Sequence, residues 1–275
     1  ECIFCVKPSE RTGEFYLTEV FKLMYEKGYK TRTFMAEDPA EILGVNTRWD
    51  LALAENVIRL RILQQWAEKG NTIHQPESVW IEPDVSLEGD VEIHPDVMLI
   101  GKTKIGRNCV IGKGSIIENS LIEEGAVIEP YSVIRNSKIM SKARIGPFAH
   151  IRDQSTVGEE SQIGNFVEVK KSLIEKDVKA KHLAYIGDAY IGSSTNIGAG
   201  VVFANFDGKK KHQTHVGSNA FIGSNSLLIA PLKIGDFAFV AGGSVVNKDV
   251  PEGYLAISRP SLKLLKDKGR EKLTW

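Results

Sequence analysis

From Ile81 to Val246 a large aliphatic residue returns about every six positions, and polar residues and glycines fill the intervals. The residue two places before each aliphatic one is usually small or β-branched. A period of six fits neither the 3.6-residue period of a helix nor the two-residue period of a strand. It predicts a hexapeptide solenoid, a parallel β-helix with one inward side chain per short strand. The inward series is Ile81, Leu87, Ile93, Leu99, Ile105, Ile111, Ile117, Ile122, Ile128, Ile134, Ile139, Ile145, Ile151, Val157, Ile163, Val169, Ile174, Ala180, Ile186, Ile191, Ile197, Phe203, Val216, Ile222, Leu228, Ile234, Val240 and Val246.

This period also predicts the shape of each coil. Six residues form one strand and a corner, so three strands close a triangular coil of about 18 residues, with successive coils about 4.8 Å apart. The 28 inward positions then give about nine coils around one continuous core. The period alone leaves the handedness of the coil open.

The residues outside the repeat have different patterns. We expect an amphipathic helix over Glu14–Gly28, a short strand over Thr31–Ala36, and a long helix from Asn46 or Thr47 to about Lys69. One apolar stripe of the long helix is typical of core packing. It consists of Leu51, Ala54, Ile58, Ile62 or Leu63, and Trp66. After Val246 we expect the repeat to be lost and the chain to end in a basic helical tail, Ser261–Trp275.

Charge and cysteine content narrow the classes of protein. The 35 basic and 35 acidic residues balance, so no nucleic-acid partner and no membrane surface is indicated. No apolar stretch approaches the roughly 18 residues that span a bilayer, and no signal peptide opens the chain. Three cysteines, one at the core-type position Cys109, fit a reducing cytoplasm, and Cys2 and Cys5 form a lone CxxC motif. Because the first residue is Glu1, we expect a fragment of a longer protein.

Counting strands along the repeat predicts which residues stack on adjacent coils. Arg152 and Lys170 follow inward residues three strands apart, so they should lie about 5 Å apart on one outer face. Two stacked cations favour a bridging anion, which suggests a phosphate site. A solvated pair of surface charges remains the alternative.

The same count places Asn165, His182 and Ala199 in one column. A histidine beside the backbone amide of a small residue is a candidate pair of general base and oxyanion donor. A lone histidine on a strand is also typical of a structural role, so both interpretations stay open.

The repeat is interrupted once, because the step from Phe203 to Val216 is 13 residues. The extra residues predict a loop over Asn205–His215, and a loop ejected from a solenoid often binds ligands. The lysine run Lys209–Lys211 either attracts an anionic ligand or only keeps the loop soluble. His212 and His215 have HxxH spacing, which without further ligands is weak evidence for a metal.

Several motifs together resemble one family. They are GPFAHIR (146–152), IGNFVEVKK (163–171), KHLAYIGDAYIG (181–192), NIGAG (196–200), ANFDG (204–208), FIGSNSLLIAP (221–231), LAISR (255–259), GEFYLTE (13–19) and GVNTRWDLALAE (44–55). The chain resembles the acetyltransferase part of the bacterial bifunctional N-acetylglucosamine-1-phosphate uridyltransferase/glucosamine-1-phosphate N-acetyltransferase family. The resemblance covers nearly the whole chain and implies that the β-helix is left-handed.

The resemblance implies a role for each matching residue. His182 matches the catalytic base. The substrate-binding positions are Arg152, Lys170, Tyr185 and Asn196. The acetyl-CoA positions are Ala199, Asn205, Phe206, Ser224, Gly242 and Arg259. Phe206 stands where the family commonly has tyrosine, and Gly242 where it commonly has alanine.

The family's function implies transfer of an acetyl group from acetyl-CoA to the amine of glucosamine 1-phosphate, on the route to UDP-N-acetylglucosamine and the bacterial cell wall. It also implies a cytoplasmic homotrimer with its site between neighbouring prisms. The expected organisation is a uridyltransferase remnant (1–45), a helical arm (46–72), the β-helix (73–250) and a tail (251–275). The Gly-rich nucleotide loop is missing from the sequence, so we expect no uridyl transfer, and Mg²⁺ only for the half that is not in this chain.

Two other classes of protein, and one variant of the acetyltransferase, are alternatives. A hexapeptide metalloenzyme of the carbonic-anhydrase kind needs converging histidines, and His150 and His182 occupy different strand positions; we therefore expect no metal. A binding prism without catalysis is the second class. An acetyltransferase acting on another amino sugar keeps the fold and the chemistry.

Overall fold

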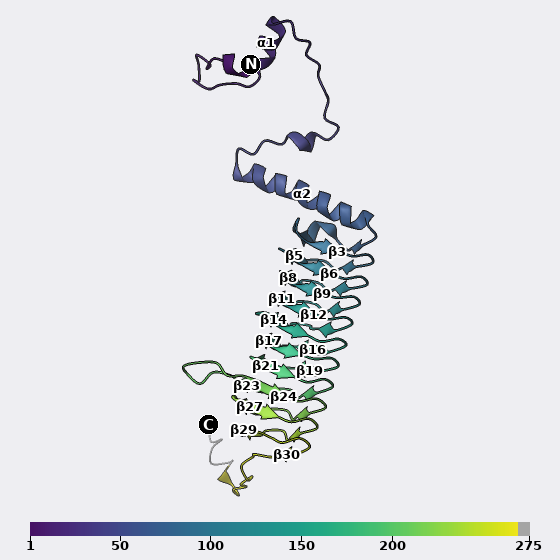
Figure 1. The fold of residues 1–275 in the computed structure, drawn as a ribbon, viewed down its shortest axis with the longest axis vertical. Helices are drawn as coiled ribbons and strands as arrows, with labels where there is room; N and C mark the ends of the chain where they lie inside the picture. The colour runs from purple at the N-terminus through teal and green to yellow at the C-terminus, as the bar shows by residue number, and fades with distance from the viewer. Residues whose placement is uncertain (269–275) are drawn as a thin grey trace. The chain divides into compact units, whose positions relative to one another are not determined.

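The computed structural model describes residues 1–268, which fall into two compact units, Glu1–Ala54 and the chain from Glu55 onward. Three sheets of parallel strands make up most of the second unit, and Figure 1 shows their strands stacked coil upon coil. Consecutive strands of the chain belong to different sheets, so the backbone winds around a three-sided prism. We call the outer surfaces of the 11-, 10- and 9-stranded sheets face A, face B and face C.

The strands are short, as a six-residue period requires. Face A runs in the order β1 (Thr72–Ile73), β4 (Glu92–Ile93), β7 (Val110–Ile111), β10 (Val127–Ile128), β13 (Arg144–Ile145), β16 (Gln162–Asn165), β19 (Lys179–His182), β22 (Asn196–Ile197), β25 (Phe221–Ile222), β28 (Phe239–Val240) and β30 (Leu255–Ala256). Face B runs in the order β2 (Trp80–Ile81), β5 (Met98–Ile100), β8 (Ile116–Glu118), β11 (Val133–Arg135), β14 (His150–Arg152), β17 (Glu168–Lys170), β20 (Tyr185–Gly187), β23 (Val202–Ala204), β26 (Leu227–Ile229) and β29 (Val245–Val246). Face C, from the first coil to the last, comprises β3 (Ser86–Leu87), β6 (Lys104–Ile105), β9 (Leu121–Ile122), β12 (Lys138–Ile139), β15 (Thr156–Val157), β18 (Leu173–Ile174), β21 (Ala189–Ile191), β24 (Thr214–Val216) and β27 (Leu232–Ile234).

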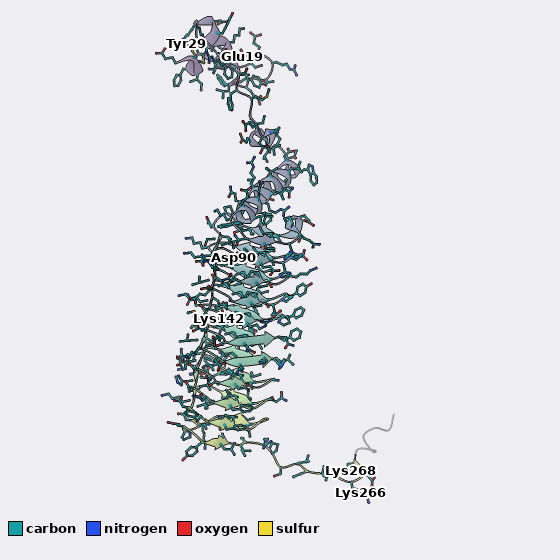
Figure 2. All side chains as sticks on the ribbon, turned by 90° about the vertical axis from the view of Figure 1, so that its right-hand side faces the viewer. Glu19, Tyr29, Asp90, Lys142, Lys266 and Lys268 are labelled. Atoms are coloured by element: carbon teal, nitrogen blue, oxygen red, sulfur yellow. The ribbon has the colours of Figure 1, made fainter. Side chains whose placement is uncertain are left out.

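The core is the inward column of aliphatic side chains. All 28 residues of the predicted series are buried, from Ile81 at 2% exposure to Val246 at 6%. The prediction of one inward residue per strand is therefore confirmed. The outward side chains project from the prism in Figure 2, where Asp90 and Lys142 mark two corners.

Small polar residues fill the space beside the inward column. Ser161 donates from its hydroxyl to the carbonyl oxygen of Glu175 at 2.7 Å, and Thr195 donates to that of Gly217 at 2.7 Å. Both side chains are buried, and these bonds remove the cost of burying a hydroxyl. Cys109 takes the same position, and burial raises the pKa of its thiol to about 11, so it is an inert core residue.

The first unit differs from the sequence-based expectation. The helix α1 covers Glu19–Glu26 and is shorter than the predicted Glu14–Gly28. The strand predicted over Thr31–Ala36 is wrong, because these residues form neither helix nor strand. Two 3₁₀ turns, η1 (Cys2–Cys5) and η2 (Pro39–Ile42), complete the unit. No residue of 1–54 is buried, so no packed core holds this segment in a strand.

The long helix α2 covers Arg48–Glu68 and starts where the sequence predicts. Thr47 accepts a hydrogen bond from the Asp50 N–H at 3.1 Å, while the Asp50 carboxylate accepts one from the Thr47 N–H at 2.8 Å, which forms a reciprocal cap. The expected core packing of its apolar stripe is wrong for the first half of the helix, because Leu51 and Ile58 are about half exposed. Only Leu63 is buried, with Ile62 and Trp66 packed against the same core.

The end of the β-helix extends past the predicted repeat. A turn, η3 (Pro76–Ser78), lies near its start, and β30 adds one more strand after Val246 by pairing with β28. Residues 261–267 are not helical, which contradicts the first part of the helical tail predicted over Ser261–Trp275; the rest of that prediction lies outside the described residues. No helix within residues 1–268 is long and apolar enough to cross a membrane.

Candidate functional site

The predicted pair of stacked cations lies on face B. Arg152 ends β14 and Lys170 ends β17, and the two residues are direct register partners, so the stacking prediction is confirmed. The guanidinium of Arg152 bonds Glu168 at 2.7 and 2.8 Å and Asp153 at 2.8 Å. The Asp153 carboxylate also lies 4.0 Å from the Lys170 Nζ. An acidic side chain therefore already sits between the two cations, and stacking alone does not require a phosphate.

Lys170 is unusually buried for a lysine, at 9% exposure. Its Nζ lies 3.8 Å from the buried carboxylate of Asp188. Asn205 donates to that carboxylate at 2.6 Å and lies 3.5 Å from the Tyr185 hydroxyl. Gly187 is stacked on Lys170, and a Cβ there would come within 2.5 Å of the Tyr185 hydroxyl oxygen. The glycine thus leaves room for the tyrosine to lie across the cation.

The loop between β23 and β24 projects from the stacked coils (Figure 1). Asp207 accepts hydrogen bonds from the backbone N–H groups of Lys209 and Lys210 at 2.8 Å each and pairs with His212 at 2.7 Å. The bond from Lys210, then those from His212 and Lys209, lower the pKa of Asp207 to about 2. These contacts close the loop into a tight turn that carries Lys211 toward face B.

Lys211 is a residue that the sequence singled out only as part of a lysine run. Its amine lies beside the Lys170 amine. Contact with the Lys170 amine, together with repulsion from its charge, lowers the pKa of Lys211. The same contact raises the pKa of Lys170, with Asp188 adding to the effect against the cost of burial. The side chains of Arg152, Lys170 and Lys211 therefore converge at one place on face B.

His182 ends β19 on the edge between face A and face B. Its Nδ1 lies 2.8 Å from the Asn165 Oδ1, one coil away, as the strand count predicted. Because an amide oxygen only accepts, the Nδ1–H donates, and the neutral ring keeps a free lone pair on Nε2. Gly164, next to Asn165, admits this close approach, since a Cβ there would overlap the Lys181 carbonyl. The ring is exposed and oriented, as a general base must be.

The column through His182 continues into the predicted acetyl-CoA positions. The register pairs Ala180 with Ile197, Ile197 with Ile222, and Ile222 with Val240. The residue two places after each of these is His182, Ala199, Ser224 and Gly242. Hydrogen bonds from Asn225 to Ala199 at 2.8 Å and from Gly243 to Ser224 at 2.7 Å hold the coils of this edge together.

Two further features of this edge suit an acyl donor. Within residues 1–268 no hydrogen bond of the Ala199 N–H is found, so this donor is open to an incoming oxygen. The side chain of Arg259 extends to the same edge, with its Cδ 3.6 Å from where a Gly243 Cβ would stand.

Not every predicted site residue is brought together. Asn196 points out of face A, in register with Phe221, while Tyr185 and the cations lie on face B. His212 and His215 have separate partners, because His212 pairs with Asp207 and His215 stacks on Tyr190 at 4.4 Å. Their HxxH spacing therefore marks no shared metal position.

Comparison with known proteins gives close relatives of this chain. Residues 77–165 match the family described as GMPPB C-terminal domain, and residues 213–248 match the hexapeptide repeat of succinyl-transferase. A protein of Aquifex aeolicus named Bifunctional protein GlmU is 64% identical over 99% of this chain and 59% of its own length. The protein of the same name from Hydrogenobaculum sp. is 56% identical over 99% of this chain and 59% of its own. The resemblance seen in the motifs is thus confirmed, and the chain spans less than two thirds of these relatives.

A solved structure supports the fold. The UDP-N-acetylglucosamine acyltransferase of Campylobacter jejuni superposes with a TM-score of 0.52 at 20% identity, over 68% of this chain and 71% of that one. This likeness, with the hexapeptide match, shows that the chain is a left-handed parallel β-helix.

Proposed function

We propose that this chain, whose relatives are the bifunctional proteins named GlmU, transfers an acetyl group from acetyl-CoA to the amine of glucosamine 1-phosphate in the cytoplasm. The observation that carries this proposal is the position of His182, held by Asn165 with Nε2 free beside the open Ala199 N–H. A base and an oxyanion donor at one edge are what amide formation from a thioester requires.

The proposed reaction is a direct attack. The neutral substrate amine bonds through its nitrogen to the thioester carbonyl carbon as His182 Nε2 takes one of its protons. The carbonyl oxygen becomes an oxyanion that the Ala199 N–H stabilises. The carbon–sulfur bond then breaks, the thiolate of coenzyme A leaves, and the proton on His182 returns to that sulfur. The products are N-acetylglucosamine 1-phosphate and coenzyme A.

The sugar phosphate is assigned to the cations of face B. Arg152, Lys170 and Lys211 offer charge-assisted hydrogen bonds to its oxygens. The phosphate replaces the Asp153 carboxylate between the first two cations. This exchange favours a dianionic phosphate over a single carboxylate charge, so the cluster discriminates for phosphorylated sugars. Tyr185 and Asn196 are the remaining proposed sugar contacts.

The acetyl-CoA contacts are assigned to Ala199, Asn205, Ser224, Gly242 and Arg259, together with the exposed ring of Phe206. Phe206 lacks the hydroxyl of the tyrosine that is common in the family, so its contribution is limited to packing. Gly242 keeps the backbone groups of the family's alanine, so this change matters little.

A homotrimer completes the proposed site. Asn196 on face A and the cations on face B contact one substrate only if face A of one prism lies against face B of another. An exposed aromatic ladder runs along the edge between these faces: Tyr131, Phe148 and Phe166 stack with ring centroids 5.3 and 5.4 Å apart. All three rings are about half exposed, and such a surface favours burial against another copy.

The proposed organisation assigns residues 1–45 to the end of a uridyltransferase domain, 46–72 to a connecting arm, 73–250 to the acetyltransferase and 251–275 to a tail. Since the Gly-rich nucleotide loop is not in the sequence, the purified chain should release no pyrophosphate from UTP and N-acetylglucosamine 1-phosphate. Mg²⁺ is assigned to that other activity alone.

A substrate panel tests the proposed activity. The chain is incubated with acetyl-CoA and glucosamine 1-phosphate, glucosamine, glucosamine 6-phosphate or galactosamine 1-phosphate, and thiol release is measured. Turnover should be fastest with glucosamine 1-phosphate, and low with glucosamine because it leaves the cations of face B unpaired. A preference for another amino sugar would correct the substrate, and no turnover with any of them would make the prism a binding module.

A further inference from the structure

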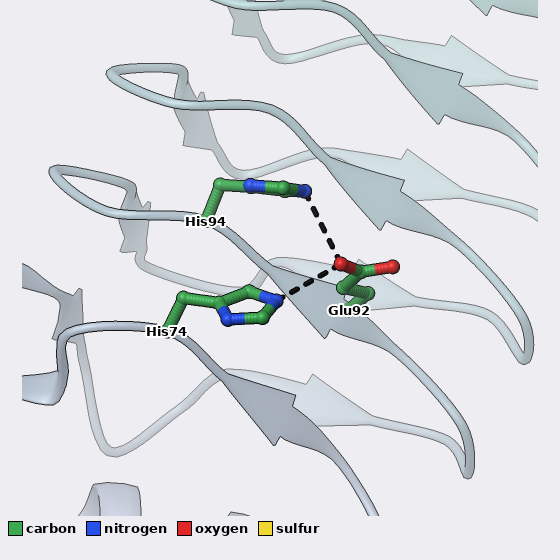
Figure 3. Close-up of side chains that lie close together, drawn as sticks. All are labelled: His74, Glu92 and His94. Carbon is green, nitrogen blue, oxygen red and sulfur yellow. Dashed lines mark hydrogen bonds and ion pairs between the residues drawn. The ribbon is translucent and has the colours of Figure 1, made fainter.

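A second cluster of functional side chains lies at the other end of face A. His74 follows β1, and Glu92 and His94 lie on and just after β4, the neighbouring strand. The register pairs Ile73 with Ile93, so His74 and His94 are stacked one coil apart. Figure 3 shows both imidazoles directed toward the Glu92 carboxylate.

The distances within this cluster suit a metal ion. The Nε2 atoms of His74 and His94 lie 2.9 and 3.4 Å from the same Glu92 oxygen, Oε1. The three ligand atoms all lie within 4.8 Å of one another. Bonds of about 2.0–2.1 Å in a tetrahedral zinc site put neighbouring ligand atoms about 3.4 Å apart. Small side-chain rotations therefore bring all three donors onto one ion.

The backbone beneath the cluster is fixed. The N–H groups of His74, Glu92 and His94 donate to the carbonyls of Ile93, Cys109 and Ile111 at 2.9 to 3.0 Å. The donor side chains thus project from a backbone held by hydrogen bonds, which lowers the conformational entropy lost when an ion binds. This part of face A lies five strands from β19, about 24 Å from His182 at the usual strand spacing.

The neighbouring residues leave the donor atoms of the cluster accessible to solvent and place no cation on the Glu92 carboxylate. The register partners of Glu92 are Thr72 and Val110, so no lysine or arginine stacks on this carboxylate along the ladder. Gly112 follows the register partner of Ile93 on the next coil and adds no side chain above His94, and the side chains of His74, Glu92 and His94 are 45%, 43% and 37% exposed. A fourth coordination position is thereby accessible to water.

From these observations we propose that His74, Glu92 and His94 form a binding site for a divalent transition-metal ion, with zinc as the expected occupant. Two imidazoles and one carboxylate are a donor set that suits zinc and disfavours magnesium or calcium. Because the site links the first two strands of face A, the ion fastens the first coil of the β-helix to the second. It takes no part in acetyl transfer.

Zinc titration of the tag-free, EDTA-treated chain tests the site. Calorimetry and the zinc content after dialysis should both give one ion per chain, and zinc should raise Tm. Magnesium at the same concentration should do neither. Cobalt in place of zinc should give the visible absorption of a four- or five-coordinate ion, which reports the ligands independently of stability.

Matched variants decide whether these residues are the ligands. His74→Ala, His94→Ala and Glu92→Gln should each weaken zinc binding at least tenfold, while His215→Ala, an outward histidine on face C, should not. Acetyl transfer should be unchanged in all four. Absence of stoichiometric zinc binding, or equal affinity in the wild type and the His94→Ala variant, would overturn the proposal. Because these side chains are exposed, circular dichroism should show folded protein throughout.

Discussion

At the scale of single residues, the charge on Lys170 controls the cation cluster. Burial at 9% exposure disfavours the charge on a lysine, but contact with the Lys211 amine and the carboxylates of Asp188 and Asp153 raise the pKa of Lys170. The pKa of Lys211 shifts in the opposite direction, because contact with Lys170 lowers it. As pH rises, the cluster therefore loses charge first at Lys211.

This difference predicts a pH dependence of ligand binding. As pH rises from 7.5 toward the ordinary lysine pKa of about 10.5, Lys211 deprotonates before Lys170, and affinity for the phosphate falls. N-acetylglucosamine 1-phosphate is the probe, because it has no amine and its phosphate stays dianionic above pH 7.5. Its Kd, measured by calorimetry between pH 7.5 and 9.5, should rise in the wild type and stay flat in Lys211→Arg. An equal rise in both proteins would remove Lys211 from the site.

Some of these residues could be placed from the sequence and others could not. Arg152, Lys170, Asn165 and His182 lie in unbroken repeat, where counting strands gives register. Lys211 lies in the loop that interrupts the repeat, and only its fold, closed by Asp207, shows where the side chain ends. His74 and His94 are 20 positions apart, beyond the usual coil length of 17 or 18, and His74 precedes the first residue of the series.

At the scale of elements, the inward aliphatic residue is what defines each strand. A strand of two to four residues has little intrinsic stability, so each strand depends on the side chain that it contributes to the core and on the neighbouring coils. This dependence explains why periodicity predicted the β-helix well. It also explains why prediction failed for Thr31–Ala36, where the strand-like residues have no buried partner in residues 1–54.

A pair of adjacent substitutions tests this dependence. Ile163→Asp places an unpaired carboxylate in a fully buried position between two coils and should cost at least about 4 kcal/mol of unfolding free energy. Gln162→Asp, its outward neighbour on β16, should change that free energy by less than about 0.5 kcal/mol. Urea unfolding followed by circular dichroism measures both. Similar costs for the two variants would show that the inward column is not the source of stability.

At the scale of the whole molecule, a prism with three outer faces has edges as well as surfaces. The edge between faces A and B carries the His182 column and the aromatic ladder, so the proposed reaction and the proposed assembly share one edge. Burying this edge against a second copy would also exclude water from the reacting amine, which strengthens the electrostatic contribution of the Ala199 N–H.

The aromatic ladder gives a test of assembly. Phe166→Asp places charge at one end of the ladder and should convert a trimer of 30.4 kDa chains to smaller species. Phe237→Asp, at another edge and similarly exposed, should leave the trimer intact. Light scattering after size-exclusion chromatography gives the masses. A wild-type monomer, or a Phe166→Asp trimer, would contradict the proposed interface.

The most direct measurement is the kcat of His182→Ala for acetyl transfer to glucosamine 1-phosphate. Removal of a general base should lower kcat by about 10² to 10⁴, with the oligomer mass unchanged. Lys170→Ala should instead act mainly by raising KM, and His215→Ala should match the wild type. If His182→Ala keeps a kcat near that of the wild type across neutral pH, then His182 is not the base, and the edge between faces A and B only binds its ligands.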